Sequence, residues 1–283
     1  MDISGLIEKA VAGRWIAGAG ISDAVALGRR INTGGASAIF NYLGEDLKSP
    51  QEVDDAVETY LKLIDAIGRN GMDASISLKP TELGIDIGRK VAEGNYSRIV
   101  RAARRGNVFV WMDMESHRYV DPTIALYRRQ LKGGGVGICI QSYLRRSGDD
   151  LARLVRDGAV IRLVKGAYTE SRRIAFGSRT QTTANYYELM KYLFKHSKRF
   201  MIATHDQGII DEAQLLNRSY RRDVTYAMLN GIRNRYAMQL ARISKVALYV
   251  PFGRRWFAYS YRRLKEEGHL MLILRSILEN QSV

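Results

Sequence analysis

Residues 51–81 have the sequence QEVDDAVETYLKLIDAIGRNGMDASISLKPT, and the hydrophobic pattern changes in the middle of the stretch. In residues 51–69 the apolar side chains recur every three or four positions, which is the spacing of one helix face. Asn70 and Gly71 are typical of a helix C-terminus. Residues 72–78 form a short, mostly apolar run, which favours a buried strand. The stretch therefore predicts one helix followed by one strand.

The same two-part unit recurs along the chain. Helical spacing also marks residues 183–198, 208–217 and 230–244. Eight strands that alternate with helices in 283 residues favour an α/β fold of the distorted (β/α)8 TIM-barrel type, with an open doubly wound sheet as the alternative. We predict strands at residues 36–43, 72–78, 108–113, 136–141, 159–164, 200–204, 224–229 and 246–249.

The chain shows no internal domain boundary. A hydrophobic fraction of 46% is enough for one substantial core. We expect residues 1–35 to form extra helices outside the barrel, and residues 36–283 to form the catalytic barrel domain. The N-terminus lacks a signal-peptide pattern, and the apolar run 270–274 is far shorter than the roughly 20 residues of a membrane span. We therefore expect a soluble, cytoplasmic protein.

The charge balance is strongly basic, with 44 Lys and Arg against 29 Asp and Glu. A net charge of +15 favours anionic partners such as an acidic substrate, a phosphate-bearing cofactor, nucleic acid or an anionic membrane. The basic residues are dispersed and no nucleic-acid-binding motif is present, so we expect no nucleic-acid partner. The basic excess after residue 241 favours peripheral contact with an anionic membrane.

The cysteine, histidine and glycine residues argue against three kinds of site: a reactive thiol, a metal site and a dinucleotide-binding loop. Cys139 is the single cysteine and lies in an apolar run, which predicts a buried, inert thiol. The spacing of the four histidines matches no metal site. Gly18-Ala19-Gly20 lacks both the third glycine and the preceding strand of a dinucleotide-binding loop.

Unusual polar residues stand where the predicted strands end. In a barrel these ends share one face, and that face is where active sites of this architecture occur. The residues are Lys79, Asp113, Glu115, Gln141, Tyr143, Lys165, Tyr168, Thr204, His205, Asp206 and Tyr249.

Lys79 and Asp113, together with Arg162 inside a predicted strand, predict a charged pocket. Arg162 stands inside an apolar strand, so it lies either on a solvated edge or inside the barrel mouth with a partner. Lys79 and Asp113 end neighbouring strands, and we expect them to form an ion pair, either as a structural salt bridge or as part of a pocket. His205 is either a phosphate ligand or a hydrogen-bonded core residue.

A second cluster lies near the C-terminus. On a helix, Tyr259, Arg262, Arg263 and Glu266 share one face. Two adjacent arginines can hold a carboxylate through paired hydrogen bonds, which lysines do poorly. A solvated basic face is the alternative.

Taken together, these motifs are similar to those of the proline dehydrogenase family, in its small, single-activity microbial form. The resemblance runs from about residue 41 to residue 266, with six motifs in family order. They are Ser77-Leu78-Lys79-Pro80-Thr81, Asp113-Met114-Glu115, Ile140-Gln141-Ser142-Tyr143, residues 162–168, Ala203-Thr204-His205-Asp206 and residues 249–266.

The resemblance implies an FAD-dependent enzyme. It implies oxidation of L-proline to Δ1-pyrroline-5-carboxylate, the first step of proline catabolism to glutamate, with electrons passing from the flavin to a membrane quinone. The basic excess near the C-terminus adds the hypothesis of peripheral contact with the inner face of the cell membrane, where the quinone resides. A pyrroline-5-carboxylate dehydrogenase is a candidate partner that the sequence does not decide. A flavin enzyme that acts on another small cyclic amine, such as a hydroxylated proline, remains the alternative.

The resemblance also assigns roles to residues on the substrate side. Arg262 and Arg263 would grip the proline carboxylate, and Glu45 would pair with the first of them as a gate. Lys79 and Asp113 would border the ring and amine of the substrate. Tyr249 would pack over the ring.

On the cofactor side, the resemblance places Arg162 near flavin N5 and gives it, with Asp113, a catalytic role. Gln141 would hydrogen-bond the flavin ring system. The remaining flavin contacts would come from Met114, Lys165, Gly166, Ala167, Thr204 and His205.

Four positions depart from the family pattern. Asp206 stands where many relatives have asparagine, and Thr169 stands where some have tryptophan. Ala227 and Asn230 are also unusual. Asp206, Thr169 and Ala227 are expected to alter flavin or adenosine contacts and weaken FAD retention, while leaving the predicted carboxylate clamp in place.

Overall fold

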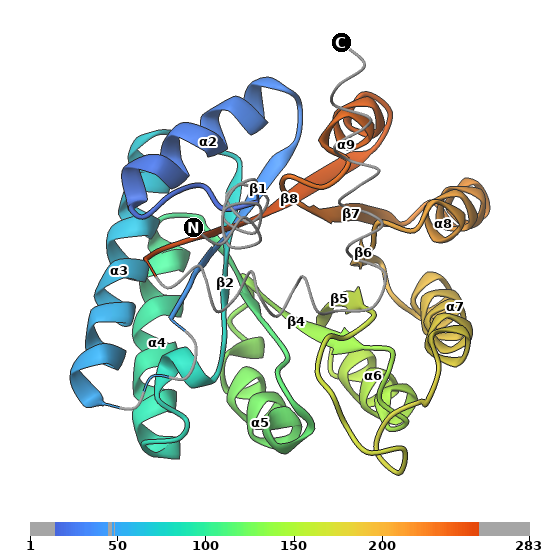
Figure 1. The fold of residues 1–283 in the computed structure, drawn as a ribbon, viewed down its shortest axis with the longest axis horizontal. Coiled ribbons are helices and arrows are strands. Elements are labelled where there is room, and N and C mark those ends of the chain that lie inside the picture. The colour runs from blue at the N-terminus through green and yellow to red at the C-terminus, as the bar shows by residue number, and fades with distance from the viewer. Residues whose placement is uncertain (1–14, 45–46, 48, 255–283) are drawn as a thin grey trace, which may run out of the picture.

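The computed structural model describes residues 15–44, 47 and 49–254. Eight parallel strands close into one barrel, in which each strand pairs with the next along the chain and β1 pairs with β8 (Figure 1). The predicted (β/α)8 barrel is confirmed and the open sheet is excluded. The strands are β1 (Ser37–Tyr42), β2 (Ala74–Leu78), β3 (Phe109–Met112), β4 (Val136–Gln141), β5 (Val160–Val164), β6 (Arg199–Ala203), β7 (Asp223–Leu229) and β8 (Lys245–Phe252).

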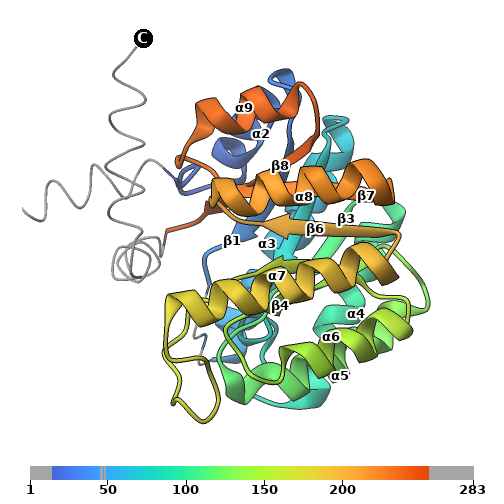
Figure 2. The same cartoon turned by 90° about the vertical axis from the view of Figure 1, so that its right-hand side faces the viewer.

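Helices surround the strands and cover their outer surface (Figures 1 and 2). None of the helices in the described ranges is long and apolar enough to cross a membrane. The helices are α2 (Ile21–Thr33), α3 (Pro50–Arg69), α4 (Arg89–Arg105), α5 (Val120–Leu131), α6 (Ser147–Arg156), α7 (Arg179–His196), α8 (Gln207–Tyr220) and α9 (Asn234–Ala241), with short 3-10 turns η1 (Thr81–Leu83) and η2 (His117–Tyr119).

Helix α3 shows why the predicted helix forms where it does. The Ser49 hydroxyl accepts a hydrogen bond from the Glu52 backbone N–H at 3.2 Å, and the Glu52 carboxylate accepts one from the Ser49 N–H at 3.2 Å. This reciprocal cap, with Pro50 in the first turn, defines the start of the helix. Gly71, at a φ of 57°, follows its end. The buried face consists of Val53, Ala56, Val57, Tyr60, Leu63, Ile64 and Ile67.

The region around β7 and β8 differs from the sequence prediction. A helix was expected over residues 230–244, but α9 covers only Asn234–Ala241. The Asn230 N–H still donates to the Tyr249 carbonyl at 2.9 Å, so position 230 belongs to the end of the sheet. Strand β8 is longer than predicted because its pairing with β1 continues to Tyr42 and Phe252.

Packing divides into an outer core between strands and helices and a smaller core inside the barrel. The inner core contains Ile39, Trp111, Met201, Ala227 and Ala247. Successive side chains of a strand point to opposite faces, so the residue two positions after an inner-core residue also faces the barrel axis. The side chains of Asn41, Asp113 and Tyr249, two positions after Ile39, Trp111 and Ala247, are therefore expected to face the axis at the C-terminal end of the barrel.

A cavity of about 570 Å³ opens at the other end, where the strands begin. Ser37, Ser75 and Thr225 contribute small polar side chains to its lining. Active sites of this architecture lie at the C-terminal end of the strands, so the cavity is separate from the candidate site.

Candidate active site

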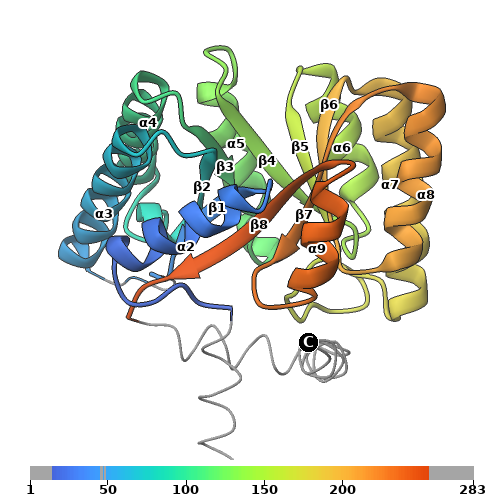
Figure 3. The ribbon, with the colours of Figure 1, turned by 90° about the horizontal axis from the view of Figure 1, so that it is seen from above.

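Five of the predicted site residues lie at the C-terminal ends of five successive strands. Lys79 follows β2, Asp113 follows β3, Gln141 ends β4, Lys165 follows β5 and Thr204 follows β6. In Figure 3, β8 ends on the side of the barrel where the described N-terminal segment lies, and the Gly253 N–H donates to the Gly18 carbonyl there at 2.9 Å.

Arg162 points into the barrel, and its side chain is only 3% exposed. Its Nη2 donates to the Asp113 carboxylate and, at 2.8 Å, to the Ser77 hydroxyl. Its Nε donates to Cys139 Sγ at 2.8 Å. The edge-strand alternative for Arg162 is therefore excluded, and Cys139 lies beside the pair that Arg162 forms with Asp113.

Two aromatic rings also contact this guanidinium. Its central carbon lies 5.1 Å from the centroid of the Trp111 ring and 5.5 Å from that of Tyr249. Contacts of this kind are attractive because an aromatic face carries partial negative charge. The cation is therefore held by rings as well as by hydrogen bonds.

Asp113 is the shared acceptor of this cluster. Its Oδ2 accepts from the Tyr249 hydroxyl at 2.9 Å, and its Oδ1 accepts from the Cys139 thiol at 3.3 Å. Burial raises the pKa of Asp113, but the charges of Arg162 and Lys79 and these hydrogen bonds bring its pKa below the usual value. Asp113 is therefore an ionised carboxylate whose two oxygens are both occupied.

Lys79 has different partners from the one predicted. Its Nζ donates to Asn41 Oδ1 at 2.8 Å and lies 3.4 Å from Glu82 Oε1. The predicted Lys79–Asp113 ion pair is wrong, since the ion pair of Asp113 is with Arg162. The cause is the 3-10 turn η1, which brings Glu82 back beneath Lys79, where Glu82 also accepts from the Lys79 backbone N–H at 3.0 Å.

A second buried carboxylate lies next to this group. Glu115 accepts hydrogen bonds from the Thr81 N–H at 3.0 Å and from the Thr81 hydroxyl at 2.9 Å. Burial raises the pKa of Glu115 to about 7, against the lowering effect of these hydrogen bonds and of the Lys79 charge. Glu115 therefore titrates near neutral pH.

Two unusual features lie beside the strand ends: a buried polar atom without a partner among the described residues at Gln141, and a backbone conformation specific to glycine at Gly166. Gln141 Nε2 donates to the Met114 carbonyl at 3.0 Å, while the buried Gln141 Oε1 has no hydrogen-bond partner among the described residues. Gly166 has a φ of 106°, and a Cβ there would lie 2.1 Å from the Tyr143 ring. Only glycine fits here, because its φ is positive and the Tyr143 ring fills the space that a side chain would need.

The end of β6 forms a further polar group. Lys165 Nζ lies 3.0 Å from Asp206 Oδ2, while Asp206 Oδ1 accepts from the Gly208 N–H at 3.1 Å and so caps α8. The Thr204 hydroxyl accepts from the Asp206 N–H at 3.0 Å. His205 Nε2 accepts from the Leu229 N–H at 3.1 Å, which supports the hydrogen-bonded alternative for His205.

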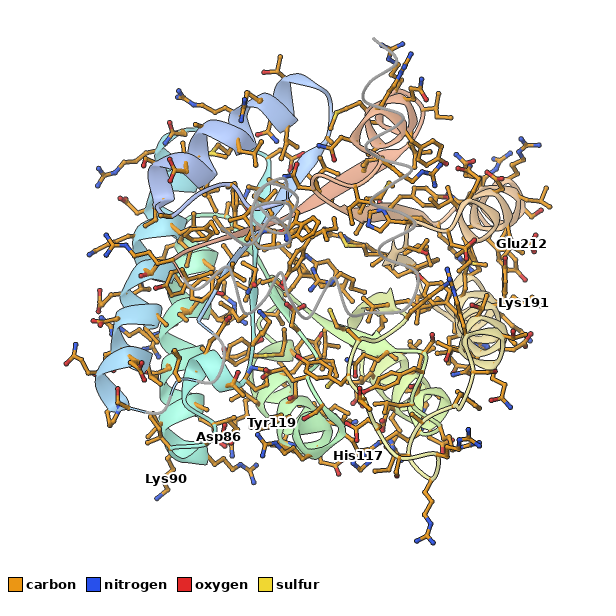
Figure 4. The ribbon with its side chains drawn as sticks, in the orientation of Figure 1. Asp86, Lys90, His117, Tyr119, Lys191 and Glu212 are labelled. Carbon is orange, nitrogen blue, oxygen red and sulfur yellow. The ribbon has the colours of Figure 1, made fainter. Side chains whose placement is uncertain are left out.

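The periphery of the barrel carries other polar residues. Tyr119 donates to the Asp86 carboxylate at 2.7 Å, and both lie on the outer rim beside His117 (Figure 4). Lys191 and Glu212 likewise project from the outer helices α7 and α8 (Figure 4). Across residues 15–44, 47 and 49–254, no three His, Cys, Asp or Glu side chains form a group able to hold a metal ion.

Comparison with known proteins identifies the family. Residues 24–272 match the family model described as proline dehydrogenase. The chain is 32% identical to proline dehydrogenase 1 of Bacillus subtilis subsp. natto over 94% of this chain and 90% of that protein. It is 33% identical to the proline dehydrogenase of Deinococcus radiodurans over 90% and 86% of the two chains. The chain belongs to the proline dehydrogenase family.

A solved structure has the same fold. Proline utilization A (PutA) from Bdellovibrio bacteriovorus, inactivated by N-propargylglycine, superposes with a TM-score of 0.84 at 22% identity. The match covers 93% of this chain but 33% of that one, so the present chain spans about a third of the length of the PutA protein.

Several predicted site residues fall outside the part of the chain that the structure describes. Glu45, Arg262 and Arg263 are among them, so the predicted carboxylate clamp and its gate stay predictions. Of the departures from the family pattern, Asp206 caps α8, Ala227 fills the barrel interior, and Asn230 Nδ2 donates to the Trp15 carbonyl at 3.5 Å. Thr169 is exposed, as is the predicted flavin neighbour Ala167, while Met114 is buried.

Sequence reasoning missed several members of this candidate site. Ser77 and Cys139 contact Arg162, while Asn41 and Glu82 hold Lys79. Strand alternation could have identified two of them. Ser77 stands two positions before Lys79, and Cys139 two positions before Gln141, so each shares a strand face with a predicted site residue.

Proposed function

We propose that this chain catalyses the FAD-dependent oxidation of L-proline to Δ1-pyrroline-5-carboxylate, with a quinone as the electron acceptor. The family membership and the relatives named proline dehydrogenase support the substrate and reaction class. The structural observation that carries the proposal is the buried Arg162 cation at the C-terminal end of the barrel, whose Nη1 has no partner among the described residues.

The described residues fit a flavin in this position. Gln141 Oε1 and Arg162 Nη1 are buried polar atoms without a described partner, and such atoms usually have one in native structures. An acceptor and a charged donor suit the polar edge of a flavin ring. Gly166 is a further proposed flavin contact, and its backbone conformation is one that only glycine adopts readily. The other proposed contacts are Met114, Lys165, Ala167, Thr204 and His205.

The proposed mechanism assigns the hydride acceptor to the cofactor and the positioning to the protein. An FAD held here would supply the two-electron acceptor for a hydride from C5 of proline, and the amine proton would leave to solvent. Arg162 supplies fixed positive charge where negative charge develops, which lowers the barrier because the dipoles and charges need no rearrangement. The ring of Tyr249 is placed against the substrate and is oriented by its hydroxyl contact with Asp113.

Proton transfer from the substrate is not assigned to Asp113. Its lowered pKa and its occupied oxygens make it a poor base. Proline must reach the site with a neutral amine before the hydride leaves C5, so rates should rise toward alkaline pH. Arg262 and Arg263 are proposed to hold the carboxylate, with Glu45 as their gate.

The deciding experiment is an anaerobic titration of the FAD-supplemented protein with L-proline, followed by the visible absorbance of the flavin. Bleaching by L-proline supports the proposal. Flavin binding without bleaching would mean that the substrate is wrong, and stronger bleaching by 4-hydroxyproline would mean that a hydroxylated proline is preferred. D-Proline serves as the matched stereochemical control.

The proposed partners need separate tests. Reoxidation of the proline-reduced protein by a soluble quinone analogue supports quinone as acceptor. Sedimentation with anionic vesicles at low salt, compared with neutral vesicles, tests contact with the inner face of the cell membrane. A pyrroline-5-carboxylate dehydrogenase is the proposed downstream partner, because the product is its substrate.

A further inference from the structure

The hydrogen bonds of Arg162 determine how the plane of its guanidinium is oriented. Asp113 accepts from a single nitrogen of the guanidinium, Nη2, so this ion pair alone leaves the group free to rotate about the contact. Paired hydrogen bonds would fix the plane, but Asp113 offers its second oxygen to Tyr249.

Two further contacts remove that freedom. Ser77, on β2, accepts from Nη2 at 2.8 Å, and Cys139, on β4, accepts from Nε at 2.8 Å. The three acceptors lie on β2, on β4 and directly after β3, along one edge of the planar guanidinium. Because a guanidinium is planar, fixing Nε and Nη2 also fixes the direction of the Nη1 N–H bonds.

We infer that Ser77, together with Cys139, is a positioning residue that aims the Nη1 donors of Arg162 at the reacting groups. The inference rests on the proposed function, in which Arg162 lies beside the flavin. Ser77 is fully buried, and its carbonyl accepts from Asn41 Nδ2 at 3.0 Å and from the Tyr60 hydroxyl at 2.8 Å, so its own position is fixed.

Loss of the Ser77 or Cys139 contact should slow the chemical step and leave the affinity for proline unchanged. A tilted guanidinium would place positive charge less well for the arriving hydride, so turnover would fall. The proposed carboxylate clamp lies elsewhere in the chain, so the KM for proline would stay nearly constant. A displaced cation would also stabilise the reduced, more negative flavin less, and shift its midpoint potential to a more negative value.

The test compares Ser77→Ala with Ser75→Ala. Ser75 stands two positions earlier on the same face of β2, and its hydroxyl donates to the Ala38 carbonyl at 3.4 Å, away from Arg162. We expect Ser77→Ala to lower kcat about tenfold, with the KM for proline changed less than about twofold. Its FAD midpoint potential, measured by dye-coupled reduction without proline, should become more negative. Ser75→Ala should change none of these values.

Cys139 provides a second pair of variants if Ser77→Ala fails to fold. Cys139→Ser keeps an acceptor for Nε and should retain the wild-type potential, whereas Cys139→Val removes the acceptor and should shift it. Unchanged kcat and potential in both Ser77→Ala and Cys139→Val would overturn the inference.

A flavin-free measurement separates this inference from the proposed function. In protein labelled with nitrogen-15 arginine, the Nε–H signal of Arg162, assigned by its loss in Arg162→Lys, should exchange slowly with solvent. Exchange should accelerate in Ser77→Ala and Cys139→Val but not in Ser75→Ala. Failure of proline to bleach the flavin would contradict the proposed function, while equal exchange in all variants would contradict the positioning role.

Discussion

The Tyr249 hydroxyl donates a hydrogen bond to the Asp113 carboxylate at 2.9 Å and so connects β8 to β3 across the mouth of the barrel. The same carboxylate accepts from Arg162 on β5. One buried anion therefore orients a ring and a cation that come from two other strands. Asp113 therefore orients its neighbours, a role that suits a carboxylate whose pKa is lowered and which stays ionised.

Tyr249→Phe keeps the aromatic ring and removes the contact with Asp113. We expect kcat/KM for proline to fall about tenfold, since a hydrogen bond to a charged acceptor is worth about 1.5 kcal/mol. Steady-state kinetics measures the effect. Tyr96→Phe is the matched control, because the buried Tyr96 hydroxyl has no hydrogen-bond partner in the described ranges. An equal change in both variants would show that the Tyr249 hydroxyl has no special role.

Asp113→Asn tests the buried ion pair. The amide leaves the Arg162 cation without an anionic partner, and breaking a buried pair in this way typically costs about 3–5 kcal/mol. Urea unfolding should therefore show a lower free energy of unfolding, and turnover should fall. Asp211→Asn, on the exposed face of α8, is the control and should be nearly neutral. A stability equal to wild type would mean that Ser77, Cys139 and the two aromatic rings hold Arg162 without the charge of Asp113.

Much of the fold was accessible from the sequence because each strand is a short apolar run and α3 has a complete cap and stripe. The polar residues at the strand ends were predicted for the same reason, since strand ends share one face of a barrel. The helix predicted at 230–244 forms, but it begins later, at Asn234, because Asn230 still pairs with Tyr249 at the end of the sheet. That pairing is a tertiary contact with β8, which local spacing does not report.

The details of the site depend on contacts between distant segments. Ser77 meets Arg162 across 85 positions of sequence, a contact that strand alternation permits but that pattern alone does not specify. Lys79 forms its ion pair with Glu82 and not with Asp113. The reason is the η1 turn, which places the carboxylate of Glu82, three residues further along the chain, next to the Lys79 ammonium. Partner choice among several nearby charges is decided by such local backbone geometry.

Asp206→Asn tests whether the departure at this position weakens FAD binding. Asp206 forms an ion pair with Lys165 at 3.0 Å, and the substitution would free this ammonium and remove a negative charge beside the N-terminus of α8. Asparagine still caps the helix, so the fold should persist. We expect the Kd for FAD, measured by fluorescence quenching, to fall about fivefold. Glu212→Gln, further along α8, controls for the general loss of charge. A weaker affinity in Asp206→Asn would show that the aspartate supports the cofactor site.

Glu115→Gln should alter the pH dependence of stability. Burial raises the pKa of Glu115 from 4.5 to about 7, so the folded protein keeps a proton that the unfolded chain loses as the pH rises. The raised pKa therefore does not reduce the free energy of unfolding below a pH of about 4.5, where Glu115 is protonated in both states. As the pH rises from about 4.5 to about 7, the unfolded chain releases this proton first, and the free energy of unfolding falls. Glutamine does not ionise, and it can still accept from the Thr81 N–H. The variant should therefore gain stability relative to wild type across that window, by at most about 3 kcal/mol.

Urea unfolding of both proteins through this pH window measures the difference. Glu188→Gln, at an exposed position on α7, should show no such trend. A constant difference between Glu115→Gln and wild type at every pH would mean that Glu115 ionises normally in the folded protein. In that case Thr81 and the charge of Lys79 would offset the cost of burial, and neutral-pH titration in this site would have to come from another group.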